Sequence, residues 1–216
     1  MLTDKIKAAV LLNTYGKNLT EDYRQHAEDK APIIGREAET RKCVEVLSKK
    51  YKNNLILVGK PGIGKTALVE SLAKKLALGD VPSTLKGKEL YEVDLQLLSA
   101  PNEDHGGPKK RLKGFIKEVE DLAGDVILFI DEVHIIMGGE AEGAMDISNT
   151  LKPSLASAHG ISVIGATTPY EYHKFMEKDG AITRRFTRVN MAEPTPVQAK
   201  SILRGRRRGL EIFYGV

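Results

Sequence analysis

The stretch GKPGIGKT, from Gly59 to Thr66, decides the fold. It carries two glycines five positions apart, followed by a lysine and a hydroxyl residue, which is the pattern of a phosphate-binding loop. The loop follows the apolar run LILV and precedes an amphipathic stretch, so it would join a buried strand to a helix. Chance alone would give the pattern in roughly one chain of this length in a hundred. The alternative is a tight strand-to-helix turn that happens to carry a lysine.

The residue types of this loop suit a nucleoside triphosphate. Glycines let backbone N–H groups turn toward phosphate oxygens, and the N-terminus of the following helix adds positive potential. Lys65 would reach the outer phosphates, and the Thr66 hydroxyl would bind magnesium. We therefore predict ATP and Mg2+ as ligands. The predicted nucleotide-binding residues of the loop are Gly59, Pro61, Gly62, Ile63, Gly64, Lys65, Thr66 and Ala67.

Short apolar runs alternate with longer amphipathic stretches along the chain, and this alternation predicts an α/β fold. Several runs are almost wholly apolar, as in strands of a parallel sheet that helices cover on both faces. Five parallel strands are expected, at residues 55–59, 90–94, 126–131, 161–166 and 187–191. The expected helices are 36–51, 65–78, 109–122, 144–158 and 170–177, and a last one that ends near residue 209.

The run VILFIDE, from Val126 to Glu132, ends in two adjacent carboxylates. In an open parallel sheet, ligands lie beyond the carboxyl ends of the strands, so this pair would face the phosphates held by the loop. Asp131 would then hold magnesium, and Glu132 would activate the attacking water as a general base. Taken alone, acids at a strand end are more often solvated turn residues. The phosphate-binding loop in the same chain reverses that balance.

Composition sets broad limits on the protein. The 216 residues include 33 basic and 29 acidic side chains, and the net charge of +4 is weak support for a nucleic-acid partner. The single cysteine, Cys43, cannot form an internal disulfide, which fits a reducing compartment. The first twelve residues hold only a short apolar run, too short to span a bilayer. We expect a cytoplasmic protein with no membrane partner.

Many stretches of the chain resemble the first ATPase module of the Clp-type AAA+ unfoldases and disaggregases. They span almost the whole chain, and they include IIGRE (33–37), LGDVP (78–82), ILFIDEVH (127–134), IGATT (164–168), EKDGAITRRF (177–186) and SILRG (201–205). The resemblance implies a three-layer AAA+ P-loop NTPase. It divides the chain into an N-terminal linker at 1–32, a large ATPase subdomain at 33–193 and the truncated start of a small helical subdomain at 194–216.

The resemblance also implies roles for particular residues. Ile33 and Ile34 match positions that pack the adenine ring. Thr168 falls at a sensor position that hydrogen-bonds the attacking water or the outer phosphate. Arg184 and Arg185 match an arginine-finger pair that reaches the ATP of the neighbouring subunit. These matches imply a ring of this chain or of related AAA+ subunits. Without the surrounding motif, the arginine pair would be read as a solvated helix end.

Two features depart from the Clp pattern. Residues 99–113 read SAPNEDHGGPKKRLK, and Asp104 stands where the family has the aromatic residue that grips the threaded polypeptide. An acidic loop lacks the apolar surface for such a grip, so we expect impaired threading. The chain also stops soon after SILRG, so we expect it to lack most of the small helical subdomain. We expect slow hydrolysis and weak oligomerisation from this chain alone.

The cluster RGRRRG, Arg204–Gly209, invites a nucleic-acid interpretation, because four arginines could contact phosphates. No aromatic platform accompanies them, and a solvated helix face is the favoured interpretation. The five histidines show no metal-ligand spacing. The favoured function is therefore a Mg-dependent ATPase module of a protein-remodelling chaperone that acts on polypeptides. The alternative is a nucleotide-dependent assembly or regulatory module that threads no substrate.

Overall fold

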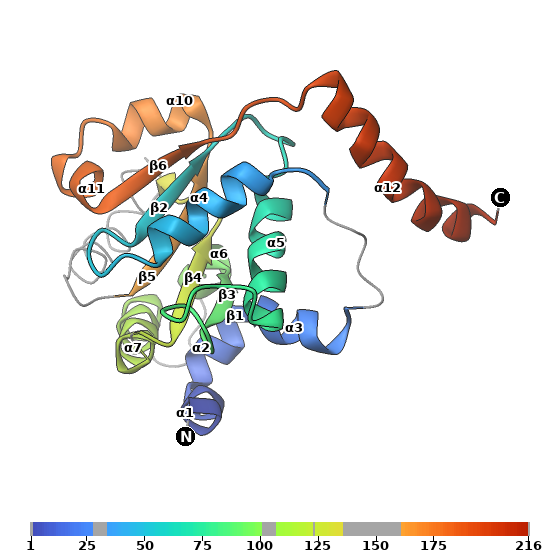
Figure 1. Ribbon diagram of the computed structural model, residues 1–216. Coiled ribbons are helices and arrows are strands. Elements are labelled where there is room, and N and C mark those ends of the chain that lie inside the picture. The colour runs from blue at the N-terminus through green and yellow to red at the C-terminus, as the bar shows by residue number, and fades with distance from the viewer. Residues whose placement is uncertain (1, 28–33, 101–106, 123, 136–160, 216) are drawn as a thin grey trace.

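One mixed sheet forms the centre of the protein. The computed structural model describes residues 2–27, 34–100, 107–122, 124–135 and 161–215 (Figure 1). Within them, six strands lie in the order β1-β3-β4-β5-β2-β6, and every neighbouring pair is parallel except β1 and β3. The strands are β1 (Gly16–Asn18), β2 (Asn54–Val58), β3 (Glu89–Val93), β4 (Val126–Ile130), β5 (Ser162–Thr167) and β6 (Phe186–Asn190).

Helices cover both faces of this sheet, which confirms the predicted three-layer α/β architecture. One face packs against α2, α6, α7 and the π-helix η2, and the other face packs against α3, α4 and α5. The helices, in chain order, are α1 (Leu2–Ala8), α2 (Val10–Tyr15), α3 (Leu19–Gln25), α4 (Glu37–Leu47), α5 (Lys65–Leu78), α6 (Leu95–Ser99), α7 (Pro108–Asp121), α10 (Pro169–Glu171), η2 (Tyr172–Met176), α11 (Gly180–Arg185) and α12 (Pro196–Tyr214).

Strand β2 shows why the sequence runs are apolar throughout. All five of its residues are buried. Ile56 and Val58 belong to the core on one face of the sheet, while Leu55 and Leu57 belong to the core on the other face. Alternate side chains of a strand point to opposite faces, so a strand covered on both faces has no side chain that faces solvent. The same burial pattern holds for β4.

The expectation of a five-stranded, wholly parallel sheet was wrong, because the N-terminal segment contributes a further strand. β1 adds a sixth strand at the edge, antiparallel to β3, with Lys17 opposite Glu92. The segment also enters the core, because Leu12 and Tyr15 of α2 are buried. β1 consists of Gly-Lys-Asn and has no apolar run. A search for apolar runs therefore passes over it, and only its pairing with β3 makes it a strand.

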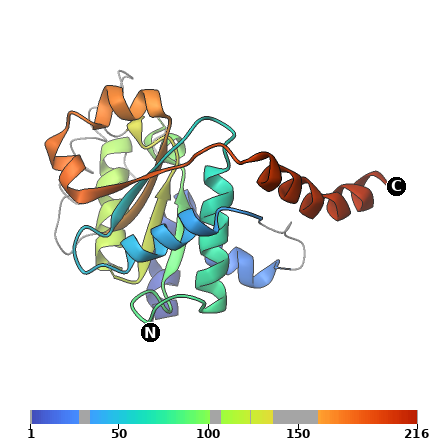
Figure 2. The same cartoon turned by 45° about the horizontal axis from the view of Figure 1, so that its top comes forward.

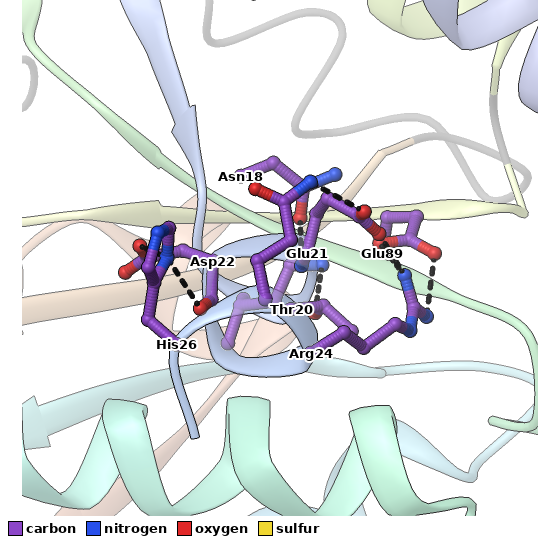
Figure 3. A network of polar contacts seen from close by, with 9 residues as sticks. Asn18, Thr20, Glu21, Asp22, Arg24, His26 and Glu89 are labelled. Atoms are coloured by element: carbon purple, nitrogen blue, oxygen red, sulfur yellow. Dashed lines mark hydrogen bonds and ion pairs between the residues drawn. The ribbon is translucent and has the colours of Figure 1, made fainter. Parts of the chain in front are cut away.

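A polar network fixes α3 to the start of β3, and Figure 3 shows how its side chains converge. Arg24 donates from both terminal nitrogens to Glu89, at 2.8 and 3.1 Å. The Thr20 hydroxyl accepts the Leu90 N–H at 2.9 Å, and Asn18 caps the helix by accepting the Glu21 N–H. An arginine that donates two hydrogen bonds to one carboxylate forms one of the stronger kinds of ion pair. These bonds join the N-terminal segment to the sheet.

The remaining helices follow the expected pattern with shifted ends. The helix expected at 65–78 coincides with α5, and the one expected at 170–177 is split into α10 and the wider-wound η2. The helix expected at 144–158 lies outside the described residues. α12 runs on to Tyr214 and extends away from the sheet in both views (Figures 1 and 2). Among the described residues, no helix is long and apolar enough to cross a membrane.

Candidate nucleotide-binding site

The phosphate-binding loop connects β2 to α5, as its sequence predicts. Gly64 has the left-handed φ of 97°, which ends the loop and allows α5 to begin at Lys65. Gly59 is needed for space, because a Cβ there would lie 2.9 Å from Ile63 Cγ2 and 3.0 Å from Met191 Cβ. The Lys65 ammonium donates to the Gly59 carbonyl at 2.9 Å, so the side chain curls back over the loop.

A strained turn places the two carboxylates at the end of β4. Glu132 has a φ of 49°, in the left-handed region that side-chain-bearing residues seldom adopt. Its N–H donates to Asp131 Oδ1 at 2.9 Å, and the next N–H, of Val133, donates to the Ala166 carbonyl at 3.0 Å. The turn is thus tied to β5. Strain of this kind gathers at functional sites, where the surrounding structure holds it in place.

Gly165 on β5 provides the space for this turn. A Cβ there would lie 2.7 Å from Val133 Cγ1 and 3.0 Å from Val133 Cβ. We therefore expect Gly165→Ala to lower the free energy of unfolding by about 1–3 kcal/mol, as overpacking of a core does. It should also slow any ATP hydrolysis, because Glu132 adjoins Val133. Urea unfolding measures the first effect, and a turnover assay measures the second.

A second substitution tests the contact. Val133→Ala removes the closest atom, Cγ1, so the Gly165→Ala/Val133→Ala protein should be less destabilised than the sum of the two single variants. An additive result would show that the cost of Gly165→Ala arises from another contact.

The phosphate-binding loop, the turn after β4 and the end of β5 enclose one pocket of about 360 Å³. It brings together most of the predicted loop and carboxylate residues, because the carboxyl ends of parallel strands meet at one edge of the sheet. Thr167 and Glu171 also line it, although neither was predicted as a site residue. The lining residues are Pro61, Gly62, Gly64, Lys65, Thr66, Asp131, Glu132, Thr167, Thr168 and Glu171.

The other predicted site residues lie elsewhere. Gly59 is buried beneath the loop, and Ile63 packs against the core around α5. Ala67 lies in the first turn of α5 and does not line the pocket. Ile34 is partly buried in the segment before α4, while Ile33 lies outside the described residues, as does Asp104.

A larger pocket of about 560 Å³ adjoins the first and shares Asp131 and Glu132 with it. Its walls come from β1, the end of β3 and the start of α6. Burial raises the pKa of the Glu92 carboxyl in this pocket, and the nearby carboxylates of Asp131 and Glu70 raise it further against the opposing effect of Lys17. No residue of the phosphate-binding loop lines this pocket, whereas Lys65 and Thr66 line the smaller one.

Arg36 connects the segment before α4 to the loop. Its guanidinium donates to the Ile63 carbonyl at 2.8 Å, to the Ala192 carbonyl at 2.7 Å and to Glu39 at 2.9 Å. It also has a left-handed φ of 69°. The side chain therefore joins the loop to the segment that follows β6 and leads to α12. Sequence reasoning did not single out this residue.

The arginine pair lies far from the pocket of its own chain. Arg184 and Arg185 are exposed at the end of α11, immediately before β6. β6 runs parallel to β2, with Phe186 opposite Asn54 and Asn190 opposite Val58. The loop follows the far end of β2, so the pair is separated from it by the length of a five-residue strand, about 16 Å.

The comparisons with known proteins agree with this geometry. Residues 55–193 match the family described as "ATPase family associated with various cellular activities (AAA)". The chain is 46% identical over 206 residues to the chaperone protein ClpB of Staphylococcus epidermidis, and 48% identical over 206 residues to that of Chlamydia caviae. These matches cover 95% of this chain but only 23% and 24% of the relatives.

Solved structures give the same result. The chain superimposes with a TM-score of 0.82 on Hsp104 in a closed state with ATPγS and FITC casein, at 42% identity. The TM-score is also 0.82 for the extended S. cerevisiae Hsp104–casein complex, at 43% identity. Both matches cover 95% of this chain and 34% of the other. The chain therefore belongs to the AAA family of ATPases, as a Clp-type AAA+ module.

Proposed function

We propose that this chain is the ATP-binding and Mg-dependent ATP-hydrolysing module of a Clp-type protein-remodelling chaperone. One observation carries the proposal: Lys65, Thr66, Asp131 and Glu132 line a single pocket, although they come from two separate strand ends. A cation for phosphates, two oxygen donors for a metal ion and a free carboxylate for water are the groups that phosphoryl transfer to water requires.

The roles follow from the groups that each element presents. Loop N–H groups and Lys65 bind the outer phosphates. Thr66 and Asp131 fit magnesium, since both offer hard oxygen donors on the same pocket, and a bound Mg2+ would neutralise charge on the phosphates. Glu132 takes a proton from the attacking water, and Thr168 hydrogen-bonds that water or the outer phosphate. Ile33 and Ile34 pack the adenine.

The arginine pair supports assembly into a ring. Since Arg184 and Arg185 lie at the far end of the sheet from their own loop, they act on the nucleotide of a neighbouring subunit, which is this chain or a related AAA+ module. Residues 33–193 form the ATPase subdomain, residues 194–216 begin a helical subdomain, and residues 1–32 lead into the ATPase subdomain while contributing β1 to its sheet.

The substrate is a polypeptide, as the casein complexes of Hsp104 suggest. Asp104 in place of an aromatic grip weakens threading. That substitution also favours the second candidate, a nucleotide-dependent assembly module without threading. The sole cysteine, Cys43, is buried as a free thiol whose pKa burial raises to about 12, which fits a reducing compartment such as the cytoplasm.

A concentration series tests the ATPase proposal. We expect the rate of ATP hydrolysis per subunit, measured with Mg2+, to rise with protein concentration, because each active site needs arginines from a neighbour. A rate per subunit that is independent of concentration would contradict assembly-dependent catalysis. Tight ATP binding with no turnover at any concentration would instead favour the assembly module.

A further inference from the structure

We propose that Glu171 is a positioning residue of the ATPase site, which acts through His134 to fix the turn that carries Glu132 against the loop that carries Thr168. This role presupposes that the pocket hydrolyses ATP, as proposed above. Glu171 ends the three-residue helix α10, which begins directly after β5, and its side chain lines the nucleotide pocket.

One carboxylate oxygen of Glu171 brings the two segments together. Oε2 accepts the Thr168 N–H at 3.0 Å and the Thr167 hydroxyl at 3.1 Å, and it lies 3.3 Å from His134 Nδ1. Thr167 ends β5 and Thr168 is the N-cap of α10, whereas His134 belongs to the turn after β4. A single atom therefore contacts both sides of the pocket.

Further contacts hold His134 and Thr167, two of the partners of Glu171, in place. The His134 ring stacks on Phe175 of η2, with ring centroids 6.0 Å apart and 19° between the planes. Thr167 is only 2% exposed, and its carbonyl accepts the Gly59 N–H at 3.2 Å. Glu171 is thus linked to the first residue of the phosphate-binding loop as well. Neighbouring bonds of this kind rigidify one arrangement.

The charge of Glu171 suits the same role. Burial tends to raise the pKa of its carboxyl, but hydrogen bonds from Thr168 and Thr167 and the nearby His134 outweigh burial, so the pKa lies below its usual value. Glu171 is therefore ionised near neutral pH and can accept several donors at once. His134 lies two residues after Glu132, so the position of this bridge sets the position of the catalytic turn.

A purely structural role is the competing explanation, because Thr168 and Glu171 also form the capping box of α10. The two explanations predict different rates of ATP hydrolysis for Glu171→Gln. Glutamine serves in a capping box as well as glutamate does. Its neutral amide oxygen is a weaker acceptor than a carboxylate, so it keeps the cap and weakens the contact with His134.

The experiment compares Glu171→Gln, Glu171→Ala and His134→Phe under single-turnover conditions, with affinity measured from a fluorescent ATP analogue. We expect Glu171→Ala to slow hydrolysis about 10- to 100-fold, since small misplacements of catalytic groups have effects of this size. Glu171→Gln should also slow it, and the affinity for ATP should change less than threefold. His134→Phe keeps the ring stacking on Phe175, and adding it to Glu171→Ala should cause little further loss.

The exposed His173–Glu177 pair supplies a matched control on the same segment. Glu177→Gln removes the charge of that pair outside the pocket and should hydrolyse ATP at the wild-type rate. Wild-type hydrolysis by Glu171→Gln and Glu171→Ala would overturn the proposal. So would a loss of rate, affinity and thermal stability in parallel, which is the signature of a structural role.

A readout without turnover separates this proposal from the ATPase proposal. If the wild-type chain hydrolyses no ATP, the ATPase proposal fails, and hydrogen exchange at the Val133 amide, which donates to the Ala166 carbonyl, still tests the bridge. Exchange should quicken about tenfold in Glu171→Gln, which keeps the capping box, because the turn after β4 is held less firmly against β5. Exchange should stay unchanged in Glu177→Gln. An unchanged Val133 amide in both Glu171→Gln and Glu171→Ala would overturn the positioning role.

Discussion

Replacing Glu132 with glutamine should leave ATP bound and slow its hydrolysis about 10²- to 10⁴-fold, the contribution of a general base. The amide has the size of the carboxylate but cannot take a proton from water. The backbone of the turn should be unaffected, because the bonds that hold it use the Glu132 and Val133 N–H groups. ATP affinity by calorimetry and turnover by phosphate release measure the two effects separately.

An exposed glutamate outside the pocket provides the control for this substitution. Glu120 lies on the solvent side of α7, and Glu120→Gln should match the wild-type rate. Hydrolysis by Glu132→Gln within threefold of wild type would show that Glu132 is not the base.

The strands could be predicted because a strand buried on both faces of a sheet requires a nearly continuous apolar run, which is visible in the sequence. The run expected at 126–131 and the observed β4, Val126–Ile130, differ by one residue, and the other four differ by one residue at either end. Asp131 and Glu132 could be placed beside the phosphate-binding loop from topology alone, since parallel strands end at one edge. Both residues line one pocket with residues of the loop, which fits that placement. Their chemical roles stay predictions.

Long-range pairing was not predictable in the same way. β1 becomes a strand only because it pairs with β3, which lies more than seventy residues later, as the match of Gly16 with Val93 shows. No apolar run marks it. Glu171 was missed for a related reason: its place depends on side-chain contacts with Thr167 and His134. Contacts between separate segments follow no spacing rule in one sequence.

Removing the arginine pair should produce the other large loss. Arginines supplied by a neighbour accelerate nucleotide hydrolysis about 10³- to 10⁵-fold, so Arg184→Ala/Arg185→Ala should hydrolyse ATP very slowly while it still binds ATP. Arg206→Ala removes an exposed arginine of α12 and serves as the control. Phosphate release at a concentration that supports wild-type turnover is the measurement.

Mixing two inactive variants tests whether the arginines act between subunits. Glu132→Gln subunits retain Arg184 and Arg185, whereas the double-alanine subunits retain Glu132. In an equal random mixture with head-to-tail contacts, about a quarter of the sites combine both intact halves, so activity should return to about a quarter of wild type. No return of activity in rings that assemble normally would mean that the pair acts within its own chain or not at all. The position of the pair at the opposite end of β6 from the loop argues for recovery, because no side chain spans the length of a five-residue strand.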